Sequence, residues 1–442
     1  MKPVVALVGR PNVGKSTLFN RLAGKKLAIV HDAPGVTRDR HYVDTDIHGR
    51  EVLLLDTGGF DPESEDPLGR GIARHVALAI EEADLVVCVL DAEQPPTAAD
   101  REAVMLLRRA EKPVLWVANK ADNPARELEA NELFSLGIDE LLPVSAVHGR
   151  GVAELSAAIV GALPPPEPGR SAEEGEEAAP RVALIGRPNA GKSSLLNRLS
   201  GAERALVDSR PGTTRDPLDV RLEFDGKSYV VVDTAGIRRR PRVEEGVEAA
   251  SVVRSLRALE RAEVVVLMCD ASEGVTDQDA RLLGLCIERG RAVVVGLNKI
   301  DLVRGAERKR ALEQAADALR FARWAPLIAL SAHNGSGVPE LMRSVHAAAG
   351  EFKKRVSTAA LNRFFEQVLE RRQPPTRGGR APRIYYVTQA QVAPPLFIAM
   401  SNAPGAIAES YTRFLTNQIR AAFGFEAVPL SVIYRKRERR AS

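Results

Sequence analysis

The sequence predicts an α/β fold in which one phosphate-binding domain occurs twice in tandem, followed by a small α+β domain. The first observation is an octapeptide, GRPNVGKS at Gly9, which returns as GRPNAGKS at Gly186. The second is that four further motifs follow each octapeptide in the same order. The third is a shift to basic composition near the carboxyl end. An ordered repeat of this length indicates duplication of a whole domain.

Each octapeptide has the spacing of a phosphate loop. The apolar run Val4–Val8 before the first copy predicts a buried strand, and Thr17 to Leu22 predicts a helix. A loop in this position points backbone N–H groups at phosphates. The alternative is a chance glycine-rich turn, and the second copy argues against it. The predicted contacts are Gly9, Arg10, Pro11, Asn12, Val13, Gly14, Lys15, Ser16 and Thr17, and Gly186, Arg187, Pro188, Asn189, Ala190, Gly191, Lys192, Ser193 and Ser194.

Further residues are predicted around the γ phosphate and Mg²⁺. Lys15 would neutralise the β and γ phosphates, and the Ser16 hydroxyl would bind Mg²⁺. Asp56 would reach the metal through water, and the Gly59 N–H would meet the γ phosphate. Thr37 is the candidate second hydroxyl ligand, on a loop ordered by the γ phosphate; the alternative is an ordinary exposed loop residue. The counterparts in the second copy are Lys192, Ser193, Thr214, Asp233 and Gly236.

The fourth and fifth motifs predict a guanine base. A carboxylate at Asp122, in the sequence Asn119-Lys120-Ala121-Asp122, can accept hydrogen bonds from guanine N1–H and its exocyclic amine. Adenine lacks both donors and would leave the carboxylate unpaired. Ser145 and Ala146 would place a backbone N–H near guanine O6. The corresponding residues of the second copy are Asn298, Lys299, Asp301, Ser331 and Ala332.

One expected catalytic residue is absent from both copies. Ras-like enzymes place a glutamine after the DxxG motif to orient the attacking water. Phe60 and Ile237 occupy these positions, and neither side chain can hydrogen-bond to water. Hydrolysis would then depend on a bound cation, a backbone group or a residue supplied by a partner.

The motifs and composition divide the chain into four segments. We predict a first domain at 1–163, an acidic proline-rich linker at 164–180, a second domain at 181–350 and a third at 351–442. Apolar runs without alternation favour parallel strands covered on both faces. These runs are Leu53–Leu55, Leu85–Leu90, Val114–Ala118, Val230–Val232, Val264–Cys269 and Ala292–Leu297.

The third domain is predicted to be basic and α+β. From residue 351 it carries 16 Lys and Arg against 6 Glu and no Asp, a formal charge of +10. This charge suits contact with nucleic-acid phosphates, although a basic run can also be a solvated tail. Its phenylalanines at helical spacing favour core positions over base stacking. Predicted helices are 357–372 and 406–423, and predicted strands are 383–390, 396–401 and 428–434.

Composition excludes other classes of protein. The 45% hydrophobic and 27% charged residues are typical of a soluble globular protein. No apolar run approaches the roughly 18 residues of a membrane helix, so we expect no membrane insertion. The three cysteines are too scattered for a disulfide framework or a metal cluster. Cys88 and Cys269 lie in apolar runs and are predicted to be buried.

Together these motifs resemble the Der (EngA) family of tandem bacterial GTPases. The resemblance implies two P-loop GTPase domains with mixed, mostly parallel sheets, followed by a small α+β KH-like domain. It also implies Mg²⁺-dependent hydrolysis of GTP to GDP, a cytoplasmic location, and a role in maturing the large ribosomal subunit through ribosomal RNA. Related GTPases hold K⁺ with the asparagine that matches Asn12 and Asn189, and the alternative for both is a turn-forming residue.

The third domain departs from the KH pattern, because no GxxG loop occurs after residue 351. We expect a monomer whose nucleotide states control RNA association. One alternative is a ribosome-binding scaffold that senses nucleotide with little turnover in one domain. Another, a tRNA-modification or transport GTPase, is disfavoured by the tandem arrangement.

Overall fold

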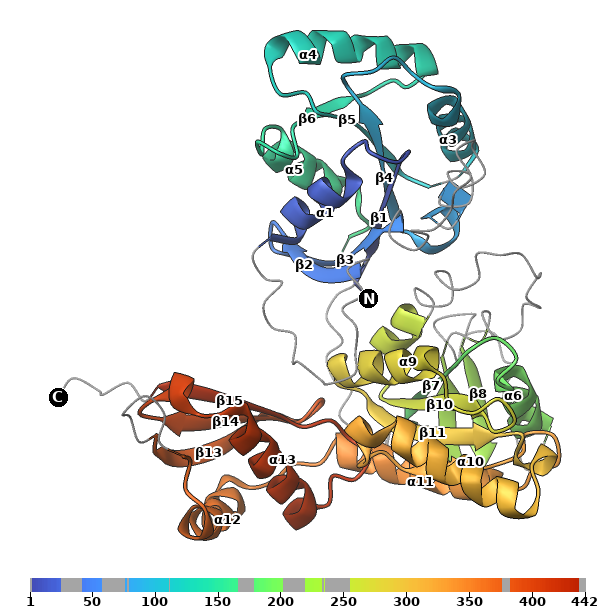
Figure 1. The fold of residues 1–442 in the computed structure, drawn as a ribbon, viewed down its shortest axis with the longest axis vertical. Helices are drawn as coiled ribbons and strands as arrows, with labels where there is room; N and C mark the ends of the chain where they lie inside the picture. The colour runs from blue at the N-terminus through green and yellow to red at the C-terminus, as the bar shows by residue number, and fades with distance from the viewer. Residues whose placement is uncertain are drawn as a thin grey trace. The chain divides into compact units, whose positions relative to one another are not determined.

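The computed structural model describes residues 2–24, 42–57, 76–77, 79–110, 112–165, 179–201, 219–232, 234, 255–375 and 382–436. These residues form two six-stranded sheets and one three-stranded sheet (Figure 1). Packing divides the chain into two units, of which the first holds the amino-terminal sheet and the second holds the other two. The predicted fold class is confirmed.

The first domain orders its sheet β2-β3-β1-β4-β5-β6, and β2 alone runs antiparallel to its neighbour. Strands β1 and β4 are buried along their whole length because helices cover both faces of the sheet. The strands are β1 (Val4–Val8), β2 (Tyr42–Ile47), β3 (Arg50–Asp56), β4 (Leu85–Asp91), β5 (Val114–Asn119) and β6 (Leu142–Val144). The helices are α1 (Lys15–Ala23), α3 (Ala98–Arg109), α4 (Pro124–Glu129), the 3₁₀ segment η3 (Ala130–Leu136) and α5 (Val152–Ala162).

The second domain repeats this topology in the order β12-β11-β10-β7-β9-β8, again with an antiparallel edge. Its strands are β7 (Arg181–Ile185), β8 (Val220–Phe224), β9 (Lys227–Val231), β10 (Val264–Asp270), β11 (Ala292–Asn298) and β12 (Leu327–Ala329). Its helices are α6 (Lys192–Gly201), α9 (Asp277–Glu288), α10 (Gly305–Ala318) and α11 (Val338–Phe352), with short 3₁₀ segments η4 (Ile300–Leu302) and η5 (Arg320–Ala322).

An edge hairpin completes each large sheet. Its inner strand, β3 or β9, was predicted at Leu53–Leu55 and Val230–Val232, whereas its outer strand, β2 or β8, was not. His48 and Gly49 join β2 to β3 with φ of 49° and 82°, and Asp225 and Gly226 join β8 to β9 with φ of 52° and 73°. Positive φ at both central residues is the geometry of a type I′ turn, which matches the twist of paired strands. The Asp-Gly pair is a recognisable hairpin signal, whereas His-Gly is a weaker one.

Two helices of the first domain share one face of its sheet. Leu18 and Leu22 of α1 join Leu155 and Ile159 of α5 in one buried cluster with β1 and β4. Helix α3 lies on the other face (Figure 1). Cys88, Cys269 and Cys286 are buried and free, which confirms the interpretation of the first two as small core residues.

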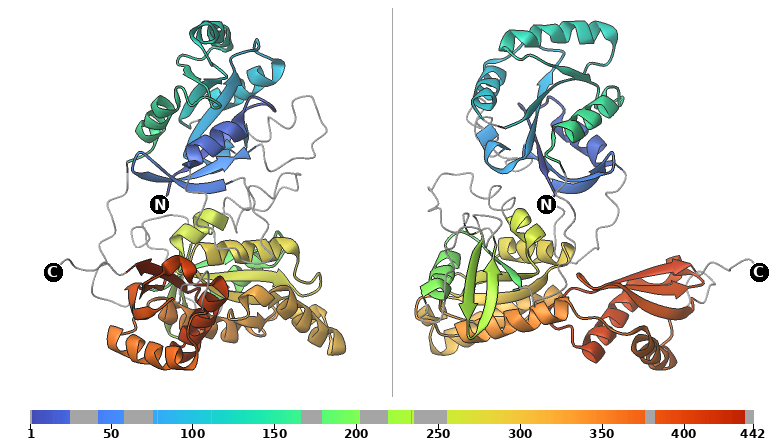
Figure 2. Two further views of the ribbon diagram at one scale, coloured as in Figure 1. Left: turned by 60° about the vertical axis from the view of Figure 1, so that its left-hand side comes forward. Right: turned by 180° about the vertical axis from the view of Figure 1, so that it is seen from behind.

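The third domain places two helices on one face of a mixed three-stranded sheet (Figure 2). Phe365 is buried, and Phe364, Phe414 and Phe423 pack against the same core, so the phenylalanines are core residues as predicted. The elements are α12 (Thr358–Arg371), β13 (Ile384–Gln391), β14 (Leu396–Ser401), η6 (Pro404–Ala406), α13 (Glu409–Phe423) and β15 (Ser431–Lys436).

The predicted final strand at 428–434 begins too early, because Ser431 is its first paired residue. Val428 belongs instead to the buried core cluster of the second domain. The Val293 N–H of β11 donates to the Ala427 carbonyl at 2.7 Å, and the Ala427 N–H donates to the Glu351 carboxylate at 2.9 Å. The segment before β15 therefore packs against the second domain. Among the described helices, none is long and apolar enough to cross a bilayer.

Candidate nucleotide sites

The two phosphate loops have the same backbone conformation. In the first loop Gly9, Asn12 and Gly14 have φ of 151°, 65° and 91°. In the second, Gly186, Asn189 and Gly191 have φ of 143°, 62° and 97°. Asparagine is one of the few residues with a side chain that adopts positive φ readily. The turn-forming interpretation of both asparagines therefore has direct structural support, independent of any role in cation binding.

The loops are packed too tightly for side chains at two glycines. A β-carbon on Gly9 would lie 2.3 Å from the Val89 carbonyl oxygen of β4, and one on Gly14 would lie 2.3 Å from Asn119 Nδ2. Gly186 and Gly191 have equivalent short approaches to β10 and Asn298. This packing holds the loop against the carboxyl ends of two parallel strands, where ligands bind in open α/β sheets.

The loop lysines fold back over their loops. Lys15 Nζ donates to the Arg10 carbonyl at 2.8 Å, and Lys192 Nζ donates to the Gly186 and Arg187 carbonyls at 2.6 Å each. Burial lowers the pKa of Lys192 to about 8, although Asp279 opposes the shift. Burial also lowers the pKa of Lys15, against the opposing effect of Asp56. Both lysines are desolvated cations that phosphate oxygens would stabilise.

Oxygen donors suitable for Mg²⁺ meet beside the first lysine. The Ser16 hydroxyl donates to Asp56 Oδ2 at 2.9 Å, at the end of β3. A hydroxyl and a carboxylate are ligands that Mg²⁺ accepts, directly or through water. These residues therefore fit the metal. Five other predicted residues lie outside the part of the chain that the structure describes, namely Thr37, Gly59, Thr214, Asp233 and Gly236.

The asparagine of each guanine motif links two loops. Asn119 Nδ2 donates to the Val13 carbonyl at 2.8 Å, and its Oδ1 accepts from the Ala146 N–H at 2.9 Å. Asn298 repeats both bonds with Ala190 and Ala332, each at 2.9 Å. The side chain is buried in both domains. Each asparagine thus joins the phosphate loop to the loop predicted to face guanine O6.

The aspartates of the guanine motifs are available for a base. In the first domain the Ser145 hydroxyl donates to Asp122 Oδ1 at 2.6 Å. In the second, Asp301 Oδ1 is buried and has no hydrogen-bond partner within the described residues. A buried carboxylate oxygen without a donor is costly, and guanine N1–H and its amine would satisfy it. This orphaned oxygen fits a guanine ligand.

The motif lysines stand in left-handed backbone, with φ of 70° at Lys120 and 61° at Lys299. Lys120 Nζ lies 2.7 Å from Asp91 Oδ2, and Lys299 Nζ lies 2.5 Å from Asp270 Oδ2. Burial would raise the pKa of Asp270, but hydrogen bonds from Lys299 and Ser272 lower it below its ordinary value. These ion pairs hold each lysine across the end of the neighbouring strand.

Several positioning residues were not predicted from the sequence. Asp91 and Asp270 end β4 and β10 and receive the motif lysines. Their signal was an aspartate at the same place after each central strand. Arg21 donates to the Ala146 and Val147 carbonyls at 2.5 Å each. Arg198 donates to the Ala332 carbonyl at 3.3 Å and also to the His333 carbonyl. Arg21 and Arg198 occupy matching positions of the repeat, and this match could have indicated their positioning role.

The phosphate-loop arginines are tied to a helix on the far face. Arg10 Nε lies 3.4 Å from Asp100, and Arg187 Nε lies 3.1 Å from Asp279. Each aspartate also closes a capping box with the threonine that begins α3 or α9. These ion pairs hold each loop against the helix, and the contact of Arg10 and Arg187 with nucleotide stays a prediction.

Comparison with known proteins identifies the domains. Residues 4–120 and 181–299 each match the family described as 50S ribosome-binding GTPase. Residues 355–435 match the family described as KH-domain-like of EngA bacterial GTPase enzymes, C-terminal. Residues 249–350 also match the family described as Elongation factor Tu GTP binding domain.

Two relatives that match over the full length are each named GTPase Der. GTPase Der of Syntrophotalea carbinolica is 46% identical over 99% of this chain and 99% of its own length. GTPase Der of Pelotomaculum thermopropionicum is 44% identical over 100% of both chains. Among solved structures, Era in complex with MgGDPNP and nucleotides of 16S ribosomal RNA is 20% identical, with a TM-score of 0.31, over 59% of this chain and 93% of that chain. A TM-score this low carries no inference.

Both nucleotide sites repeat the loop conformation and the two bonds of the guanine-motif asparagine, and the matches to these relatives extend over the full chain. The chain therefore belongs to the GTPase Der family of GTP-binding GTPases with tandem domains, and membership implies binding of GTP, GDP and Mg²⁺.

Proposed function

We propose that this chain is a GTP-hydrolysing switch that acts in assembly of the large ribosomal subunit, and that nucleotide state controls its association with ribosomal RNA. The observation that carries the proposal is the hydrogen bond from Val293 to Ala427. Val293 lies on β11, and the same strand ends at Asn298 of the guanine motif. A nucleotide-dependent change in this strand would reach the KH-like domain directly.

Other contacts strengthen this connection. Lys353 Nζ lies 2.9 Å from Glu263 Oε2, and the Arg420 guanidinium stacks on Trp324 at 4.6 Å from the ring centroid. Arg420 also donates to the Val428 carbonyl at 2.9 Å, and burial lowers its pKa to about 10. A half-buried arginine stacked on a ring favours a fixed junction over a loose one.

The proposed chemistry is attack of water on the γ phosphate. Lys15 and Lys192 would hold positive charge against the transferring group, and the backbone N–H groups of both loops would orient it. Bound Mg²⁺ supplies further neutralisation of the β and γ oxygens. Ser16 and Ser193 would hold the metal. Thr37, Thr214, Asp56 and Asp233 remain its predicted further ligands, and Gly59 and Gly236 the predicted γ-phosphate contacts.

We further propose that K⁺ at Asn12 and Asn189 replaces part of the missing catalytic machinery. GTP hydrolysis is expected to be at least about tenfold faster in KCl than in NaCl, since a cation there would stabilise developing charge. The double variant Asn12→Gly and Asn189→Gly keeps the left-handed loop, because glycine adopts positive φ without strain.

This glycine variant should lose the salt difference while keeping its affinity for GDP. Steady-state phosphate release in matched salts measures the first, and titration calorimetry measures the second. Asn197→Ala, which changes an exposed asparagine of α6, is the matched control. Equal rates in the two salts for the unaltered protein would rule out the cation.

Co-sedimentation with ribosomal subunits tests the switch. We expect binding to the large subunit to differ about tenfold or more between GDP and a non-hydrolysable GTP analogue, the usual scale of coupling between two sites. Lys15→Ala and Lys192→Ala, assayed separately, assign the effect to one domain. Binding that ignores nucleotide, with turnover confined to one domain, would instead favour the nucleotide-sensing scaffold.

The remaining expectations complete the proposal. The domain boundaries at 1–163, 164–180, 181–350 and 351–442 stay predictions, as do a cytoplasmic location and a monomeric state. Of the basic residues expected near RNA, Arg371, Arg372, Arg383, Arg435 and Lys436 are described, whereas Arg377, Arg380, Arg437, Arg439 and Arg440 lie outside the described residues.

A further inference from the structure

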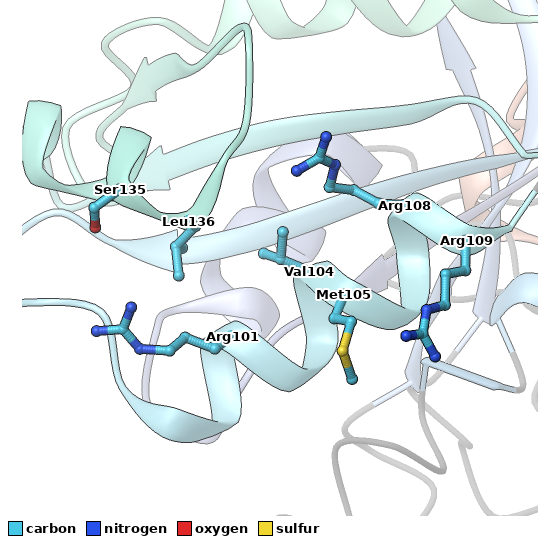
Figure 3. A pocket seen from close by; sticks show the side chains of 7 residues that line it. All are labelled: Arg101, Val104, Met105, Arg108, Arg109, Ser135 and Leu136. Atoms are coloured by element: carbon cyan, nitrogen blue, oxygen red, sulfur yellow. The ribbon is translucent and has the colours of Figure 1, made fainter.

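The first domain carries a basic hollow that neither nucleotide binding nor the KH-like domain explains. It has a volume of about 550 Å³ and lies between α3 and η3 (Figure 3). No acidic side chain lines it. The lining residues are Arg101, Val104, Met105, Arg108, Arg109, Ser135 and Leu136.

The guanidinium groups of the three arginines have no ion-pair or hydrogen-bond partner among the residues that the structure describes. Arg126, on the neighbouring helix α4, contrasts with them because it pairs with Glu129 at 2.8 Å and with Glu93 at 3.8 Å. Exposed arginines gathered around one hollow without counter-charges favour an anionic ligand.

The positions of the guanidinium groups indicate an extended ligand. Arg101 lies at one end of α3 and Arg108 and Arg109 at the other, with Met105 between them (Figure 3). Arg108 comes seven positions after Arg101 on the helix, a rise of about 10 Å. A single small anion would meet one end only, whereas a chain of phosphates can meet both.

Arg108 packs against Gly137 in the hollow. The hollow also offers apolar surface. A β-carbon on Gly137, which has φ of 78°, would come within 2.6 Å of Arg108 Nη1, so the guanidinium lies directly over this glycine. Met105, which is 47% exposed, and the half-buried Leu136 both line the hollow. An apolar floor between arginines suits an unstacked base or ribose between phosphates.

The second domain provides an internal comparison. Helices α3 and α9 begin with the same capping box, Thr97 with Asp100 and Thr276 with Asp279, and can be aligned without a gap. On this alignment Arg101, Arg108 and Arg109 correspond to Ala280, Ile287 and Glu288. The arginines are therefore not required by the shared fold, which forms the same helix without them.

We propose that the α3–η3 hollow of the first domain binds the phosphate backbone of single-stranded RNA. Arginine donates two hydrogen bonds to a phosphate in one plane, and repeated phosphates match guanidinium groups at both ends of the helix. None of its lining residues belongs to a nucleotide site or to the KH-like domain. This surface would bind RNA whether or not nucleotide state controls ribosome association.

The test exchanges the three arginines for their counterparts in the second domain, Arg101→Ala, Arg108→Ile and Arg109→Glu, in the full chain. Binding of fluorescein-labelled poly(U) is measured by anisotropy over a range of salt concentrations. Three lost phosphate contacts should reduce the slope of log affinity against log salt by about 2, at about 0.7 for each contact on a single strand. Affinity at low salt should fall at least about tenfold.

A control of equal charge separates a local site from the general field. Arg308→Glu and Arg310→Glu on α10 change two exposed arginines and alter the net charge by the same amount. This control should show the same slope of log affinity against log salt as the unaltered protein. Poly(U) containing 4-thiouridine should cross-link to the peptide that carries Met105 in the control and not in the exchange variant.

Three outcomes would overturn the proposal: an unchanged slope in the exchange variant, an equal loss in both variants, or tighter binding of labelled poly-Glu than of poly(U), which would indicate an acidic protein partner. Melting temperature and GTP hydrolysis without RNA report whether the exchange variant folds. Should it fail to fold, Arg101→Gln with Arg109→Gln removes two phosphate contacts and should still lower the slope by about 1.4.

Discussion

Asp301→Asn is expected to weaken GDP binding by the second nucleotide site by about 10⁴-fold, the discrimination shown by sites that leave a buried polar group unpaired. The Asp301 carboxylate has one buried oxygen without a partner within the described residues. Guanine offers two donors to it, N1–H and the exocyclic amine. In Asp301→Asn an amide N–H₂ group replaces one carboxylate oxygen. The site then loses one hydrogen-bond acceptor, and the amide N–H₂ donor faces the exocyclic amine of guanine, which is also a donor.

The same variant should bind xanthine nucleotides better than the unaltered protein does. Xanthine keeps the N1–H donor but has a carbonyl where guanine has the amine, and an asparagine amide can pair with both. Titration calorimetry with GDP and XDP measures this change in base preference. It is done in a Lys15→Ala background, which removes nucleotide binding by the first site. Asp317→Asn, on the exposed side of α10, is the control. Unaltered GDP affinity in Asp301→Asn would mean that this carboxylate does not contact the base.

Asn298→Ala is expected to destabilise the second domain by about 2–5 kcal/mol. The side chain holds the Ala190 carbonyl and the Ala332 N–H, each at 2.9 Å, and is buried. Alanine leaves both backbone groups unpaired, and each buried unpaired group costs about 1–3 kcal/mol. Nucleotide affinity should fall as well, because this asparagine joins the phosphate loop to the guanine loop.

The chain has one tryptophan in each GTPase domain, Trp116 and Trp324, so the domains can be followed separately. In a Trp116→Phe background, the fluorescence of Trp324 during urea unfolding reports the second domain. Asn197→Ala, at an exposed position of α6, is expected to change stability by less than about 0.5 kcal/mol. Equal midpoints for the Asn298 and Asn197 variants would contradict a bridging role.

Local patterns predicted most of the fold. The first strand was predicted at Val4–Val8 and has these bounds. Buried parallel strands are apolar on both faces, so their sequences need no tertiary information to be recognised. The outer strands of the edge hairpins, β2 and β8, were not predicted, because they mix buried and exposed residues and carry weaker signals. Val428 was assigned to the last strand because the sequence does not show which domain's core an apolar residue packs into.

The sites divide in the same way. Motif spacing by itself determined two phosphate loops, two guanine motifs and the order of the domains, because each is a short contiguous pattern. Only the tertiary structure decided that Asn119 and Asn298 cross-link loops, since their partners lie 106 and 108 residues away along the chain. It likewise decided that Arg101, Arg108 and Arg109 surround one hollow, because charge along a helix does not reveal what packs beside it.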